Sequence, residues 1–71
     1  MAKISARGDR EVARAEKQGG ACMVLTEQGR VLRKLDRTSG YNLLGRVKGS
    51  PAERRERFAQ MAEDRGYEVA A

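Results

Sequence analysis

The chain has 71 residues, of which 35% are charged, and a formal net charge of +5. This length allows one domain with a thin core, which a homodimer interface can complete, because so short a chain buries only about 60% of its unfolded surface. With one cysteine the chain cannot form an intramolecular disulfide. The absence of histidine as well excludes a zinc site. The longest apolar run, residues 21–25, is too short to cross a membrane, and no secretory signal is recognisable, so we expect a cytoplasmic protein.

The first predicted element is a helix over about residues 6–18. Small or apolar residues recur there at spacings of four, four and three, at Ile4, Gly8, Val12 and Ala15. This spacing is typical of one face of a helix. Ser5 or Asp9 can cap its start, and Gly19-Gly20 ends it.

The middle of the chain predicts three strands, at about residues 22–26, 30–36 and 41–48. A turn with Gly29 in the left-handed region joins the first two as a hairpin. The third alternates, with Tyr41, Leu43, Gly45 and Val47 on one face. Because these alternate with polar residues, we expect Tyr41 in the core.

The clearest element is a helix over about residues 51–65. Ser50, Pro51 and Glu53 form a capping box with proline at the first helical position. Gly66 ends it in the left-handed conformation, and residues 67–69 can form a short edge strand. The predicted fold is therefore α+β in the order α-β-β-β-α, a three-stranded antiparallel meander with both helices packed on one face.

Positive charge is concentrated in the middle of the chain. Residues 21–49 contain six basic and two acidic side chains, whereas residues 50–71 contain four and five. The candidate nucleic-acid-binding residues are therefore the six basic ones, Arg30, Arg33, Lys34, Arg37, Arg46 and Lys48. We expect Arg33 or Lys34, depending on the hairpin register, to share the solvent face with Arg46. An alternative is that these cations only keep an exposed sheet from pairing with other strands.

Arg54 and Arg55 are weaker candidates, for binding an anion near the start of the second helix. Runs of this kind are more often a solvated helix face. No pattern of nucleophile, base and acid is recognisable, and Cys22 is typical of a small buried apolar residue. We therefore expect no enzyme activity, no metal and no cofactor.

Residues 5–14 (SARGDREVAR) and 24–34 (VLTEQGRVLRK) resemble small uncharacterised proteins of actinobacteria and their bacteriophages. The resemblance implies a phage-encoded or accessory protein, acting in the host cytoplasm if phage-encoded, and no particular activity. The order of three strands before a helix is also similar to the DNA-binding domains of tyrosine recombinases, which read DNA with a sheet. The expected order α-β-β-β-α is similar to the double-stranded-RNA-binding domain, but its loop histidine and lysine run are missing.

Three functions are open at this point. The first is weak, electrostatic binding of nucleic acid through the sheet face. The second is docking on a host protein through an apolar patch around Leu44 with Leu25 or Leu32. The third is a structural domain that associates with itself. Charge placement favours the first by a small margin.

Overall fold

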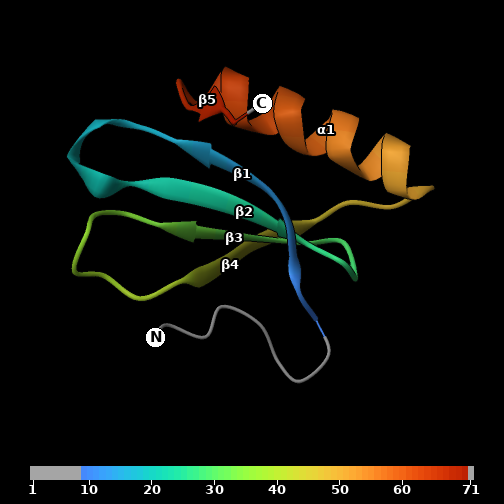
Figure 1. Cartoon of the computed structure of the whole chain (residues 1–71), viewed down its shortest axis with the longest axis horizontal. Helices are drawn as coiled ribbons and strands as arrows, with labels where there is room; N and C mark the ends of the chain where they lie inside the picture. Colours follow the sequence, from blue (N-terminus) through green and yellow to red (C-terminus); the bar gives the residue numbers. More distant parts are fainter. Residues whose placement is uncertain (1–8, 71) are drawn as a thin grey trace.

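The computed structural model describes residues 9–70, which form a five-stranded antiparallel sheet and one helix (Figure 1). The elements in chain order are β1 (Glu11–Glu16), a 3-10 turn (Gln18–Gly20), β2 (Cys22–Thr26), β3 (Arg30–Lys34), β4 (Asn42–Arg46), α1 (Pro51–Asp64) and β5 (Glu68–Val69). The strand order is β4-β3-β2-β1-β5. After the four-stranded meander, α1 crosses one face of the sheet and returns the chain to the far edge, where β5 pairs with β1.

The predicted α-β-β-β-α order is wrong, because the segment assigned to the first helix is strand β1. Residues 6–8 of that prediction, with Ile4 and Ser5, lie outside the described residues. Arg14 pairs with Val24 and Ala15 with Met23, so neighbouring side chains point to opposite faces of the sheet. Ala15 is buried in the core beneath α1. The helical spacing of Val12 and Ala15 is therefore coincidental, and strand pairing overrides the helix propensity of the alanines.

The hairpin of β2 and β3 forms as predicted, with Gly29 at a φ of 87°. Leu25 pairs with Val31 and Cys22 with Lys34, and all five residues of β2 are buried. β4 then pairs with β3, and a register shift opposite Val31 and Leu32 leaves Leu44 as an extra residue. Leu44 packs against the core, whereas its neighbour Leu43 lies on the other face. β4 is therefore an edge strand interrupted by a bulge.

The capping box at the start of α1 is confirmed. The Ser50 hydroxyl accepts the Glu53 N–H at 3.2 Å, and the Glu53 carboxylate accepts the Ser50 N–H at 2.8 Å. The bonds to the capping serine lower the pKa of Glu53. At the other end, Gly66 has a φ of 82°, as predicted, and Tyr67 donates its N–H to the Ala62 carbonyl. This bond turns the chain toward β5.

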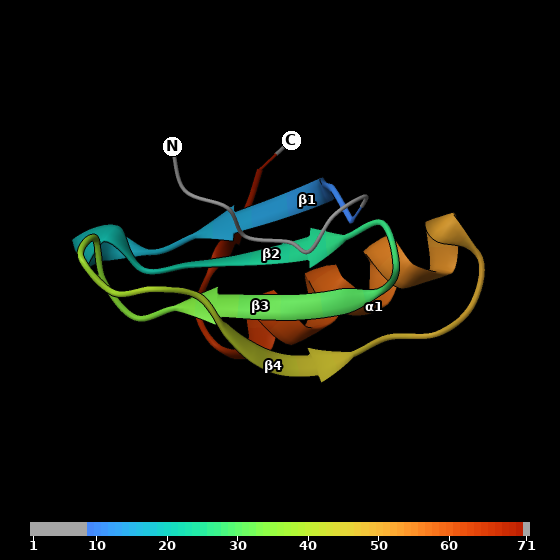
Figure 2. The ribbon, with the colours of Figure 1, turned by 90° about the horizontal axis from the view of Figure 1, so that it is seen from below.

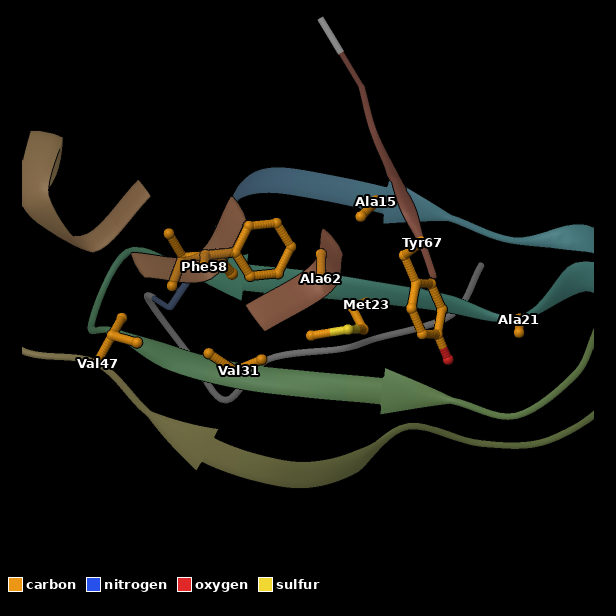
Figure 3. Close-up of a cluster of buried hydrophobic side chains, with 9 residues drawn as sticks. Ala15, Ala21, Met23, Val31, Val47, Phe58, Ala62 and Tyr67 are labelled. Atoms are coloured by element: carbon orange, nitrogen blue, oxygen red, sulfur yellow. The ribbon is translucent and has the colours of Figure 1, made fainter. Parts of the chain in front are cut away.

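The core lies between α1 and the sheet face beneath it (Figure 3). Phe58 and Ala62 of α1 pack on small or flexible side chains of the central strands, among them Ala15, Met23 and Val31. The small side chains Ala13 and Ala15 of β1 let the helix approach the sheet closely. We call this side of the sheet the helix face and the opposite side, where none of the described elements lies, the open face; Figure 2 shows the open face, with α1 behind the strands. The side chains of Cys22, Val24 and Leu32 point to the open face and are also buried.

A buried ion pair holds the start of β1 against the hairpin of β2 and β3. Asp9 is almost completely buried, and its carboxylate accepts the Gln28 N–H at 2.9 Å and the Arg30 Nε–H at 2.7 Å. Burial raises the pKa of Asp9, but these bonds lower the pKa by more, so it lies below its ordinary value. Asp9 therefore acts as a clamp between two strands and not as the predicted helix cap.

Candidate functional site

The register of the sheet decides which predicted cations share a face. Cys22 pairs with Lys34, and Met23, which packs in the core, pairs with Arg33. Lys34 therefore lies on the open face and Arg33 on the helix face. Arg46 pairs with Arg30 and shares the open face with Lys34, but at the opposite end of β3. Arg30, which pairs with Arg46, and Lys34 are four residues apart on β3, which is about 13 Å along the strand.

The sheet has one end formed by its two long connections, which we call the loop end. Residues 17–21 join β1 to β2 there, and residues 35–41 join β3 to β4 (Figure 2). Gly20 allows the two connections to pack closely, because any larger residue would place a Cβ 2.8 Å from the Arg37 backbone nitrogen. Arg37 is thereby held beside the turn that carries Lys17.

On the open face of the loop end lies a hollow of about 330 Å³, which we call the open-face hollow. It is lined by Arg14, Glu16, Lys17, Gly20, Ala21, Cys22, Lys34, Arg37 and Tyr41. The Tyr41 hydroxyl lies 3.3 Å from the Cys22 Sγ, and the Lys34 ammonium lies 5.6 Å from the centre of the Tyr41 ring. These contacts place a half-buried aromatic ring among four cations.

The expectation that Tyr41 belongs to the core is wrong. Its ring lies on the open face, because it bonds Cys22, whose neighbour Met23 points into the core. Burial raises the pKa of Tyr41, and the bond to Cys22 raises it further. The phenol is therefore neutral near pH 7 and places no negative charge among the cations.

Among the described residues, Arg14 is the one cation of this hollow that forms ion pairs with carboxylates. Its guanidinium donates to both Glu11 carboxylate oxygens at 3.0 and 3.1 Å, and Glu16 lies 3.7 Å away. The bonds to Glu11 raise the pKa of Arg14. Within residues 9–70, no carboxylate forms an ion pair with Lys34 or Arg37. Together with Lys17, which also forms no ion pair within these residues, they carry the charge that an anion would meet in this hollow.

The helix side of the loop end has a second hollow, of about 400 Å³, which we call the helix-face hollow. Its described lining residues are Lys17, Gln18, Ala21, Arg33, Leu35, Arg65 and Tyr67, which include three cations and no carboxylate. Lys17 donates to the Arg65 carbonyl at 3.3 Å and lies over the Tyr67 ring at 5.2 Å. Lys17 and Ala21 line both hollows, so the two cationic surfaces are continuous around the end of the sheet.

The other predicted cations do not join this surface. Arg30 is bound to buried Asp9, and its side chain is only 24% exposed. Arg46 and Lys48 are exposed beyond the other end of β3. Arg54 donates from a terminal guanidinium nitrogen to the Glu27 carbonyl at 2.9 Å, so it joins α1 to the hairpin. Arg55 is exposed on α1.

Three cations of the loop end, Arg14, Lys17 and Arg65, were not among the sequence candidates. Arg14 and Lys17 lie in the segment predicted as a helix, outside residues 21–49, from which the candidates were chosen. The alternation of Ala13 and Ala15 with Arg14 was the available signal, because it matches a strand with one buried face. No comparable local signal marked Arg65.

The apolar patch expected for protein docking does not form as predicted. Leu25 is fully buried and Leu32 is 6% exposed, while Leu44 packs on the core. Leu43 is instead exposed by 54%, on the open face of edge strand β4. Any apolar contact at this edge would therefore use Leu43.

Two findings concern other kinds of site. No helix within residues 9–70 is long and apolar enough to cross a membrane. In the same part of the chain, no group of three or more cysteine and carboxylate side chains is placed to hold a metal ion. Compared with known protein families, with curated proteins and with solved structures, the chain matches none.

Proposed function

We propose that this chain is a binding module, not an enzyme, that binds nucleic acid through phosphate contacts at the loop end of its sheet. One observation carries the proposal: among residues 9–70, six cations line the two hollows, whereas Glu16 is their only acidic lining residue. Phosphate oxygens are the ligands that guanidinium and ammonium groups recognise most commonly in nucleic-acid complexes. The single cysteine suits the reducing cytoplasm, where we place this binding.

The number of cations sets the strength and salt dependence of binding. Arg14 is already paired with Glu11, which leaves five cations to contact phosphates: Lys17, Arg33, Lys34, Arg37 and Arg65. Five contacts to a single strand lower the affinity roughly 100-fold between about 50 and 200 mM salt, since each contact releases counterions. We expect dissociation constants on the order of micromolar or weaker near physiological salt.

Fluorescence anisotropy with labelled DNA and RNA tests the proposal. The wild-type chain should bind at low salt, and the affinity should fall steeply as salt is added. A Lys34→Glu/Arg37→Glu variant should bind at least about tenfold more weakly, because it places two carboxylates in the open-face hollow. No binding of any nucleic acid at low salt would refute the proposal.

A matched control separates the loop end from net charge. Lys48→Glu/Arg57→Glu changes the net charge by the same amount at two exposed positions that line neither hollow. Its affinity should stay within about threefold of wild type. Equal losses in the two double variants would show that overall charge, and not the loop end, controls binding.

A second candidate is an acidic protein segment that pairs with the edge of β4. The exposed Leu43 on this edge strand, with Arg46 at its end, favours it. Binding of a polyglutamate peptide that is abolished by Leu43→Asp, and kept in Lys34→Glu/Arg37→Glu, would support this candidate. Oligonucleotide binding that Leu43→Asp leaves unchanged would support the first.

A further inference from the structure

The two cationic hollows lie on opposite faces of one sheet, which restricts the shape of any ligand that contacts both. Arg33 and Lys34 are neighbours on β3, and their side chains point to the helix face and the open face. Lys17, in the connection between β1 and β2, borders both hollows. A chain of phosphates that follows these cations must turn around the end of the sheet.

A duplex cannot make this turn. The persistence length of double-stranded DNA is about 150 base pairs, so bending it around the edge of a domain measuring 31 × 28 × 20 Å is costly. A duplex laid on the loop end therefore meets the cations of one face only. A single strand bends freely at every nucleotide and can place successive phosphates on both faces.

The open-face hollow also offers a surface for a base. Tyr41 is half-buried, and its hydroxyl contact with Cys22 holds the ring in place. Aromatic side chains on which bases stack are typical of single-strand binding sites, and stacking tolerates any base. Tyr67, in the helix-face hollow, is only 8% exposed and belongs to the core, so the stacking position is Tyr41.

We infer that the ligand is a single-stranded nucleic acid that stacks a base near Tyr41 in the open-face hollow and runs past Lys17 into the helix-face hollow. This inference rests on the proposed function. It assigns different roles to the two hollows: a duplex can lie on the open face, whereas α1 stands over the strands on the helix face, so the helix-face hollow receives only a flexible single strand.

The test compares one sequence of about 12 nucleotides as a single strand and as a duplex. Wild type should prefer the single strand. Arg33→Glu/Arg65→Glu should weaken single-strand binding about tenfold or more and leave duplex binding within about twofold. Lys34→Glu/Arg37→Glu should weaken both. Circular dichroism checks that each variant is folded, and the Arg33→Gln/Arg65→Gln pair serves if the glutamates prevent folding.

Tyr41 supplies a second readout. Tyr41→Phe should keep most of the single-strand affinity, since the stacking ring remains and only its contact with Cys22 is lost, whereas Tyr41→Leu should lower the affinity roughly tenfold. Inorganic polyphosphate, a flexible polyanion without bases, should compete more weakly than the oligonucleotide at equal charge.

Three outcomes would overturn the inference while leaving the proposed function intact. The first is that the helix-face variant binds the single strand like wild type. The second is that this variant weakens single-strand and duplex binding equally. The third is that polyphosphate competes as well as the oligonucleotide. Failure of wild type to bind any nucleic acid would instead refute the proposed function itself.

Discussion

Replacing Asp9 by asparagine should be among the most destabilising single changes at a polar side chain of the described sheet. The amide can still accept the Gln28 N–H, but it removes the negative charge that faces Arg30 at 2.7 Å. Breaking a fully buried ion pair costs about 3–5 kcal/mol. Because the Arg30 side chain is 24% exposed and water can solvate it, we expect about 2–3 kcal/mol. Urea unfolding measures this as a midpoint lowered by about 2–3 M, at a slope of about 1 kcal/mol/M.

The pH dependence of the free energy of unfolding tests the Asp9–Arg30 ion pair independently. The pKa of Asp9 is lower in the folded chain than in the unfolded chain. The ion pair therefore contributes its full stability above the unfolded pKa of about 3.9, and this contribution is lost as the pH falls through the folded pKa. Wild type should lose more stability than Asp9→Asn between about pH 5 and pH 2.

Glu27→Gln is the matched control, because it removes the same charge from an ion pair that is exposed on both sides. Arg10 and Glu27 contact each other at 3.1 Å, and their side chains are 79% and 45% exposed. This change should cost less than about 0.5 kcal/mol. If Asp9→Asn costs no more than Glu27→Gln, or shows the wild-type acid slope, the clamp does not stabilise the fold as we argue.

Three further changes can be measured by the same urea unfolding. Ser50→Ala should cost about 1 kcal/mol, because it removes the capping hydroxyl of α1, and a loss below about 0.3 kcal/mol would contradict the capping box. Gly19→Ala should cost about 1 kcal/mol, because the position has a positive φ. Gly20→Ala should cost about 2 kcal/mol or more, because a Cβ there would also clash with the Arg37 backbone. Equal costs would contradict this close approach. Phe58→Ala should cost about 3–4 kcal/mol, and a cost near 1 kcal/mol would mean that α1 packs loosely on the sheet.

The parts of the fold that could be predicted from the sequence are those specified by neighbouring residues. Ser50, Pro51 and Glu53 define the start of α1 without help from the rest of the chain. Gly29 defines the hairpin in the same way, because its left-handed backbone forms the turn between two apolar strands that pair with each other. In each case the signal spans a few residues and has a single structural interpretation.

β1 could not be predicted in this way, because its residues favour a helix. Alanine, arginine and glutamate are good helix formers, and the segment 11–16 contains only these and Val12. Its strand conformation depends on pairing with β2 and on burial of Ala15 under α1, both of which are tertiary contacts. Predicting a helix for this segment removed one strand from the expected sheet and added one helix to the fold. It also left β5 without its partner β1.

The grouping of cations at the candidate site depends on the same tertiary contacts of β1 and α1. Lys34 and Arg37 were predicted as binding residues from local charge, but the predicted partners Arg30 and Arg46 lie at the other end of β3. Their neighbours at the loop end come instead from β1 and from the end of α1, more than ten residues away in the chain. A charge count along the sequence could not group them, because the grouping depends on the topology of the sheet.

The central claim is that the cations of the loop end bind nucleic acid, and NMR mapping tests it most directly. Backbone amide signals would be followed while an unlabelled single strand is added at low salt. We predict the largest shifts at residues 17–21 and 33–37 and around Tyr41, with small shifts at residues 26–30 and 46–50. Shifts confined to residues 46–50, or no shifts at saturating oligonucleotide, would contradict the account.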